Sequence, residues 1–270
     1  MSTADVCQTL SMTESGAAGA ETLPDTAAAI WAACSGEMDI RANAMTPTLF
    51  GTPLSVYFSG RTPETNPVRK LLYLTSSAYP DALNVKGCYS GSRAKFARVK
   101  YYGEKPPAPD PFGQQLMDDG RRMEPFIFDL WQQLHPHLIA VPSGLLLDQL
   151  RPDLFGGTPD GLVFDRYTYE LVGTLELKYR PIAKQLSTDV SLIPDKYWIQ
   201  MVGQLMCLPV HRWFYMEYRD DDTYYHYTDT ITEGTKTTLR SDLLAFVELV
   251  KGSTLDSFPK RCRRYDMDKY

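Results

Sequence analysis

The sequence predicts an α/β protein in which helices flank a central sheet. Two observations support this fold class: apolar residues recur at helical spacing in separate segments, and segments with strand character lie between them. The resulting order of helix, strands, helix, strands, helix is typical of an α/β sandwich. The 270 residues are 43% hydrophobic and 23% charged, a globular composition that excludes collagen-like, coiled-coil and wholly disordered chains.

The first 27 residues are rich in Ser, Thr, Ala and Gly and contain no aromatic residue. We therefore expect a disordered tail over residues 1–27 and a single domain over residues 28–270. The proline-rich segment 105–112 is expected to be a loop inside that domain. It leads into a predicted helix at residues 113–134, where Leu, Met, Ile and Trp recur at helical spacing.

Strand segments follow that helix, because short apolar or alternating runs are bounded by turn residues. Strands are expected at residues 138–147, 161–165, 171–179, 212–219 and 223–228. Pro194 is well placed to begin a helix that ends near residue 208, since proline is tolerated in the first helical turn. A final helix is expected over residues 241–251, which carry an apolar stripe.

Charge is distributed unevenly along the chain. The net charge is −5, but residues 1–40 hold six acidic and no basic residues, which leaves 28 basic against 27 acidic residues in the remainder. Segment 85–105 holds six basic residues against one acidic residue, and a second basic cluster occupies residues 260–264. Such patches suit phosphate backbones, although solvated charged faces give the same pattern. The candidate DNA contacts in the first cluster are Arg93, Lys95 and Arg98.

The five cysteines are scattered, and no two form a C-x-x-C pair. This usage predicts free thiols in a reducing, intracellular compartment, with no zinc or iron–sulfur site. No apolar run approaches the ~18 residues of a membrane-spanning helix. The N-terminus lacks the basic and apolar regions of a secretory signal. We therefore expect no membrane partner.

Three polar residues occupy strand segments where a core would favour apolar ones. Asp160 opens one strand, and in the next strand Glu176 and Lys178 alternate with two leucines, so both polar side chains share one face. If Asp160 lies on the neighbouring strand, two carboxylates and a lysine converge. A hard divalent cation is the usual remedy for the repulsion between such carboxylates. An exposed sheet face with a cross-strand ion pair is the alternative.

The order P-D…E-x-K, in which Asp160 precedes Glu176 by 16 residues, is the signature of the PD-(D/E)xK nuclease superfamily. Together with its flanking segments, the sequence resembles the phage-lambda-type exonucleases and the related viral alkaline nucleases. This resemblance extends from about residue 41 to residue 206. It implies a restriction-endonuclease-like core, in which helices flank a central mixed sheet.

The resemblance also implies a metal and catalytic set. Segment L-E-L-K would supply Glu176, the Leu177 carbonyl and Lys178, and T-P-D-G would supply Asp160. In D-G-R-R-M-E-P, Glu124 matches an outer metal ligand, with a surface carboxylate as the alternative. The expected cofactor is Mg²⁺, for which Mn²⁺ would substitute. Lys178 would position or deprotonate the attacking water, with its pKa lowered by the nearby metal charge.

Two further segments concern the DNA substrate. R-A-N-A-M-T-P-T resembles the family's early Arg-x₆-Ser/Thr segment, so Arg41 and Thr48 would bind a terminal 5′-phosphate together with Thr158. Y-W-I-Q-M-V-G-Q-L-M makes Gln200 a candidate catalytic residue and Gln204 a candidate DNA contact. These two glutamines share one helix face, where buried amides would orient a water, the lysine or a phosphate oxygen. A solvated polar face is the alternative.

The function that this resemblance implies is a Mg²⁺-dependent deoxyribonuclease, most simply a 5′→3′ exonuclease on double-stranded DNA with free ends. It would act in recombination or in viral or phage DNA processing, with a single-strand annealing protein as partner and, for a virus, in the host nucleus or cytoplasm. A structure-selective or restriction-like endonuclease on the same fold and a catalytically silent DNA-binding protein are the alternatives. RNA stays open as a substrate, because the chemistry does not itself read the 2′-hydroxyl.

Overall fold

The computed structural model describes residues 48–53, 57, 68–69, 72–106, 110–183, 186–261 and 263–270. The expected tail and Arg41 therefore lie outside the described residues. Within these ranges, no helix combines the length and the apolar character that crossing a membrane requires.

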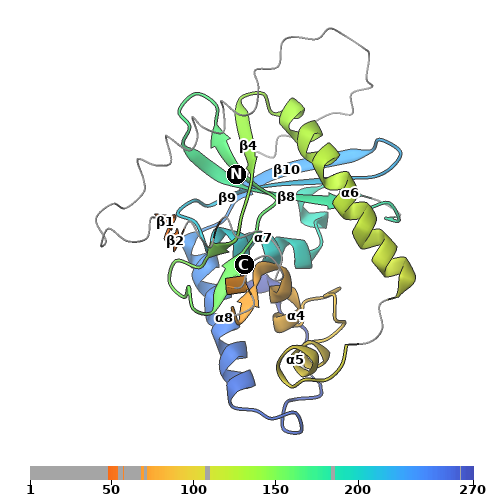
Figure 1. Cartoon of the computed structure of the whole chain (residues 1–270), viewed down its shortest axis with the longest axis vertical. Helices are drawn as coiled ribbons and strands as arrows, with labels where there is room; N and C mark the ends of the chain where they lie inside the picture. Colours follow the sequence, from red (N-terminus) through yellow and green to blue (C-terminus); the bar gives the residue numbers. More distant parts are fainter. Residues whose placement is uncertain are drawn as a thin grey trace.

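A five-stranded sheet forms the centre of the molecule, with the strand order β10-β9-β8-β7-β4 (Figure 1). Its strands are β4 (Leu138–Pro142), β7 (Gly161–Asp165), β8 (Leu171–Tyr179), β9 (Arg212–Tyr218) and β10 (Tyr224–Thr230). Strands β8 and β9 run parallel and the other neighbours run antiparallel, so the sheet is mixed, as expected. Both β7 and β8 span the ranges that their alternation and flanking turns predict.

Helices and shorter strands surround this sheet. The helices are α4 (Tyr79–Leu83), α5 (Arg93–Tyr101), α6 (Pro111–Leu134), α7 (Asp195–Leu205) and α8 (Glu233–Lys251). Single 3-10 turns are η1 (Ser76–Ala78), η2 (Val190–Leu192) and η3 (Met267–Lys269). The short strands are β1 (Thr48–Leu49), β2 (Thr52–Pro53), β3 (Leu74–Thr75), β5 (Leu146–Leu147) and β6 (Phe155–Gly157).

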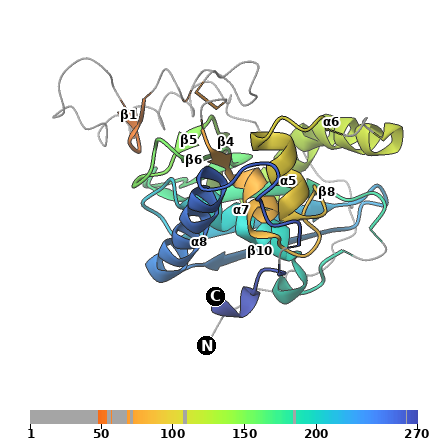
Figure 2. The ribbon, with the colours of Figure 1, turned by 90° about the horizontal axis from the view of Figure 1, so that it is seen from below.

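Each face of the sheet packs against different helices. Helix α6 covers one face, where its buried residues join a cluster that contains Leu175 and Leu177 of β8. Helices α7 and α8 pack on the other face, in a cluster that contains Tyr215 of β9. In Figure 1 the sheet and α6 occupy the upper half, and Figure 2 looks onto the end where α4, α5 and α8 gather. Because side chains alternate along a strand, Glu176 points to the α7 side, away from both leucines.

The last helix begins well before the predicted start at residue 241. Thr232 caps it by accepting a hydrogen bond from the Thr235 N–H at 3.0 Å, and Glu233 is its first residue. Its first turns bury Lys236 and Arg240, which are only 2% and 7% exposed. The buried face of α8 is therefore partly polar in its first half. This is why the apolar stripe in the sequence predicts only the second half of the helix.

These two buried cations have specific partners. The Lys236 ammonium donates to the carbonyls of Leu208 at 3.0 Å and Val210 at 2.8 Å. The Arg240 guanidinium donates to both carboxylate oxygens of Asp148, with the shortest contact at 2.9 Å. Asp148 also accepts the N–H of residue 151 after β5. The network ties α8 to the loop between β5 and β6.

Arg240→Met should lower the free energy of unfolding by about 3–5 kcal/mol, because it leaves the buried Asp148 carboxylate without its counter-ion. The matched control is Arg151→Ala, which removes the exposed Arg151–Asp153 pair and should change the stability little. Urea denaturation of both variants measures the difference. Equal losses in the two variants would contradict the assigned role of the buried pair.

Candidate active site

Glu176 is buried among polar side chains, with 1% of its surface exposed. The Gln200 amide donates to its Oε1 at 2.7 Å, and the Gln204 amide donates to its Oε2. The Lys178 ammonium also donates to Oε1. Three donors from β8 and α7 thus fix one carboxylate, which confirms that Glu176 and Lys178 share a face of β8.

Asp160 lies at the start of β7, beside the strand that carries Glu176. Its N–H donates to the Leu175 carbonyl at 3.0 Å, and its Oδ2 accepts the Leu177 N–H at 2.8 Å. The N–H and C=O of one strand residue point to the same edge, so the Leu177 carbonyl also lies on the Asp160 edge. We name Asp160, Glu176, Lys178, Gln200 and Gln204 the carboxylate cluster.

The two carboxylates repel one another. Burial, and after it the charge of Asp160, raises the pKa of Glu176 to about 7, although Lys178 acts in the opposite direction. Burial by itself would lower the pKa of Lys178, but the charges of Glu176 and Asp160 outweigh it and raise that pKa. The charges of these two carboxylates therefore favour the ammonium form of Lys178.

The donor set fits a hard divalent cation such as Mg²⁺. Asp160, Glu176 and the Leu177 carbonyl are oxygen donors, and the mutual repulsion of the carboxylates is what a cation relieves. Within the described part of the chain, Oε1 of Gln204 is buried without a hydrogen-bond partner. This orphaned acceptor suits a water held by the cation.

Glu124 lies on α6, one helical turn before Phe128. A Cβ atom built on Gly161 would lie 3.1 Å from the Phe128 ring, so α6 crosses close to the start of β7, where Asp160 also lies. Among the described residues, no group of three or more His, Cys, Asp or Glu side chains is arranged to hold a metal. The structure therefore brings α6 near the carboxylate cluster without adding Glu124 to its donors.

A second cluster, which the sequence analysis did not identify, forms next to Asp160. Strand β3 runs parallel to β6, with Thr75 paired to Gly156, so the residues that follow the two strands lie side by side. A Cβ built on Gly157 would be 3.0 Å from Oγ of Ser76. The Arg69 guanidinium donates to Oγ1 of Thr158 at 2.8 Å. We name Arg69, Ser76 and Thr158 the hydroxyl–arginine cluster.

The signal for this cluster is present in the sequence. Arg69 and Ser76 have the same Arg-x₆-Ser/Thr spacing as Arg41 and Thr48. The spacing alone does not distinguish the two pairs, and the structure places Arg69 on Thr158. Arg41 and the side chain of Thr48 lie outside the part that the structure describes.

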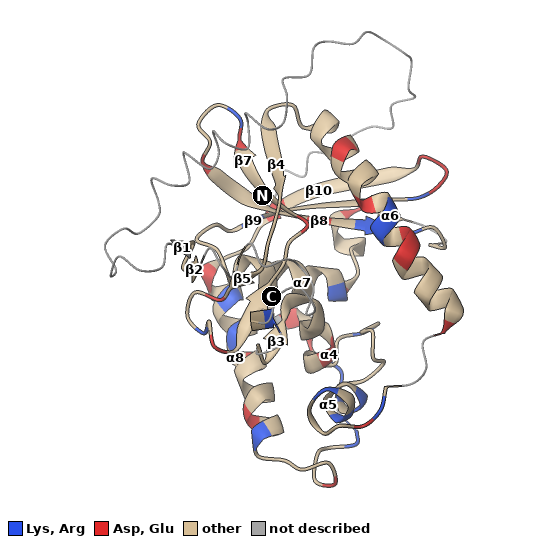
Figure 3. Ribbon diagram, in the orientation of Figure 1, with Lys and Arg blue, Asp and Glu red and all other residues tan. Residues whose placement is uncertain are grey.

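Basic residues gather on α5, which Figure 3 shows as a concentration of Lys and Arg. Of the candidate DNA contacts there, Lys95 is exposed, Arg93 is partly buried and Arg98 pairs with Glu104. Lys100 is exposed as a residue, but partial desolvation of its ammonium and then the positive charge of Arg69 lower its pKa to about 8. Helix α5 therefore adds positive charge close to the hydroxyl–arginine cluster.

A glycine sets the position of α7. A Cβ built on Gly203 would lie 2.4 Å from the Tyr79 ring and 3.3 Å from the Ser76 side chain, so only glycine allows α7 this close to η1 and α4. The approach holds Gln200 and Gln204 against the sheet. Gln204 is fully buried and donates to Glu176, so it positions that carboxylate.

Comparison with known proteins identifies the fold. No family model matches the chain, and no curated protein matches it by sequence. The alkaline exonuclease LHK-Exo from Laribacter hongkongensis has a similar structure, with a TM-score of 0.53 and 20% identity over 68% of this chain and 90% of that one. Its complex with dAMP gives a TM-score of 0.53 and 19% identity, over 68% and 91%. The chain therefore has an alkaline exonuclease fold.

Proposed function

We propose that this chain is a Mg²⁺-dependent deoxyribonuclease that digests double-stranded DNA 5′→3′ from free ends, in recombination or in viral or phage DNA processing. The observation that carries the proposal is the carboxylate cluster, where two repelling carboxylates and an ammonium meet on adjacent strands. A protein that only binds DNA gains nothing from burying such a set. The fold shared with an alkaline exonuclease supports the same class of activity.

In this proposal each residue of the carboxylate cluster has its own role. Asp160, Glu176 and the Leu177 carbonyl would hold Mg²⁺, with Mn²⁺ as a substitute and Glu124 as an outer ligand reaching from α6. When bound, the cation would acidify a water and stabilise the charged transition state. Lys178 would donate hydrogen bonds to the attacking water or a phosphate oxygen as an ammonium. Gln200 and Gln204 would keep the Glu176 carboxylate in one orientation.

The hydroxyl–arginine cluster would recognise the terminal 5′-phosphate. Arg69 offers a planar guanidinium, which pairs well with phosphate, and Ser76 and Thr158 offer hydroxyls. Thr158 lies two residues before Asp160, so a bound end and the cation would be neighbours. This proximity would make the enzyme cut close to the end that it binds.

One assay tests the proposed function. The protein is incubated with Mg²⁺ and an equimolar mixture of end-labelled linear duplex and closed circular duplex, with EDTA as the control. Loss of the linear duplex alone, from its 5′ ends, supports the exonuclease. Nicking of the circle would instead identify an endonuclease, and binding without cleavage would identify a silent DNA-binding protein.

Mg²⁺ should raise the melting temperature of the protein, because a ligand that binds only the folded state stabilises it. At a hundredfold excess over its dissociation constant, the gain should be about 2.7 kcal/mol. Asp160→Asn should abolish this shift, since it removes the carboxylate that faces Glu176. Asp165→Asn, at the far end of β7, is the control and should keep the shift. A shift that survives in Asp160→Asn would place the cation elsewhere.

A further inference from the structure

A row of alternating ammonium and phenol groups leads from the carboxylate cluster to the surface. Lys178 Nζ lies 5.1 Å from the centroid of the Tyr197 ring, and Lys196 Nζ lies 4.9 Å from the same centroid. Lys196 Nζ also lies 4.5 Å from the centroid of the Tyr89 ring. The row therefore runs Lys178, Tyr197, Lys196, Tyr89, and it begins at the ammonium that contacts Glu176.

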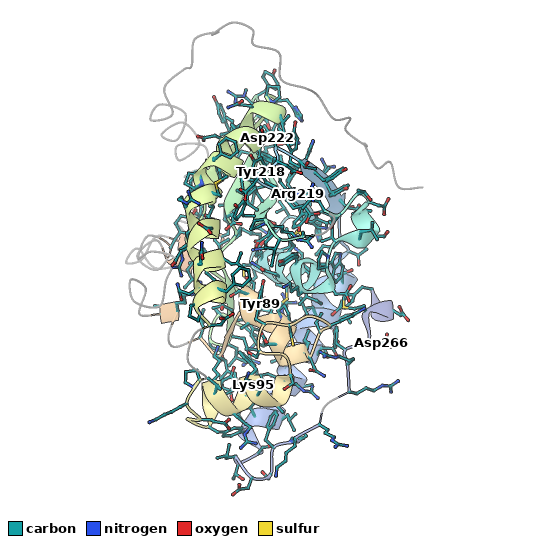
Figure 4. All side chains as sticks on the ribbon, turned by 90° about the vertical axis from the view of Figure 1, so that its right-hand side faces the viewer. Tyr89, Lys95, Tyr218, Arg219, Asp222 and Asp266 are labelled. Atoms are coloured by element: carbon teal, nitrogen blue, oxygen red, sulfur yellow. The ribbon has the colours of Figure 1, made fainter. Side chains whose placement is uncertain are left out.

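Tyr89 ends this row in an exposed position, with 58% of its surface accessible. Figure 4 shows it between the half of the molecule that carries α6 and the half that carries α5, on the same side as Lys95. The exposed Tyr89 ring offers an aromatic surface next to a cation.

The loop that carries Tyr89 is held on both sides. Cys88, just before it, is buried, and its N–H donates to the Val85 carbonyl at 3.2 Å. The N–H of Ser90, just after it, donates to the buried Asp81 carboxylate at 2.6 Å. The backbone on either side of Tyr89 is therefore held in place. Such preorganisation reduces the entropy lost when a ligand binds.

We propose that Tyr89 stacks on a nucleobase of the DNA strand being cut, while Lys196 binds the phosphate next to that base. This inference rests on the proposed function and adds two positioning residues to it. Aromatic rings that interleave with cations match the chemistry of a single strand, in which flat bases alternate with anionic phosphates. The Tyr89 phenol also interacts electrostatically with Lys178 and Glu176, so a base stacked on Tyr89 would lie close to the carboxylate cluster.

The experiment measures DNA binding and cleavage separately in the full-length protein. The probe is a 5′-phosphorylated duplex with a short single-stranded tail, bound in EDTA so that it stays intact. Tyr89→Ala should weaken binding about tenfold, and Tyr89→Trp should restore it, because stacking needs only an aromatic face. Lys196→Ala should reduce the slope of log affinity against log salt by about one, as expected for one lost phosphate contact.

Tyr167→Ala is the matched control, since Tyr167 is 79% exposed in the turn between β7 and β8, away from the row. Binding by Tyr89→Ala equal to that of Tyr167→Ala, or an unchanged salt slope in Lys196→Ala, overturns the inference. Melting curves check that each variant is folded. If the wild-type protein cleaves DNA but Tyr89→Ala behaves as wild type, only this inference fails. If the wild-type protein neither binds nor cleaves DNA, the proposed function itself fails.

Discussion

Glu176→Gln is expected to reduce metal-dependent DNA cleavage on the order of a thousandfold while the protein stays folded. Glutamine keeps the shape of the side chain but removes the charge that would hold the cation. The new amide replaces an oxygen that accepts from Gln204, and the Gln204 amide can turn over so that its Oε1, which has no partner in the described structure, accepts instead. Alanine is a poorer test, because it would leave the amides of Gln200 and Gln204 without their buried acceptor.

The control for this substitution is Glu217→Gln on the neighbouring strand. Glu217 is fully buried and accepts hydrogen bonds from Arg180 and from the N–H of Ser187, so it resembles Glu176 in burial but not in its proposed role. We expect Glu217→Gln to lower thermal stability and to keep cleavage per folded molecule. Cleavage by Glu176→Gln near the wild-type rate would refute the assignment of the carboxylate cluster.

Arg69→Ala should slow digestion of a 5′-phosphorylated duplex at least about tenfold, which corresponds to ~1.5–3 kcal/mol for a lost charge-assisted hydrogen bond. The reason is the contact between Arg69 and Thr158, which places a guanidinium beside the strand that carries Asp160. A 5′-hydroxyl duplex offers less negative charge, so it should be a poorer substrate and should be affected much less. Single-turnover rates on the two duplexes measure the difference.

Arg41→Ala is the natural comparison, because Arg41 has the same spacing to a threonine as Arg69 has to Ser76. If Arg69 binds the phosphate, Arg41→Ala should digest both duplexes at the wild-type rate. A defect in Arg41→Ala that is specific for the phosphorylated end, together with a normal Arg69→Ala variant, would reverse the assignment. Equal effects on both duplexes would argue for an endonuclease.

A short apolar run predicted β7, alternation predicted β8, and the polar turn between them marked where both end. The same alternation predicted that Glu176 and Lys178 share a face. Their convergence with Asp160 followed from the antiparallel pairing of β7 with β8. Local periodicity was sufficient for this part of the site, since all three residues come from two adjacent strands.

Other features depended on contacts that are distant in sequence. The early start of α8 was not predicted because Lys236 and Arg240 are buried through partners about 30 and 90 residues away, which no apolar pattern reveals. Arg69 could not be chosen over Arg41 for a similar reason. The pairing of β3 with β6 brings Ser76 beside Gly157, and the Arg69–Thr158 hydrogen bond joins residues 89 positions apart.

The close approach of Gly203 to Tyr79 and Ser76 limits the substitutions that this protein can accept during evolution. One glycine sits between Gln200 and Gln204 on one side and Ser76 on the other, so the two proposed halves of the site share a single point of close approach. Any side chain there would push α7 outward and displace both glutamines and the serine together. A substitution at position 203 would therefore disturb both halves of the proposed site at once, and we expect none to keep both in place.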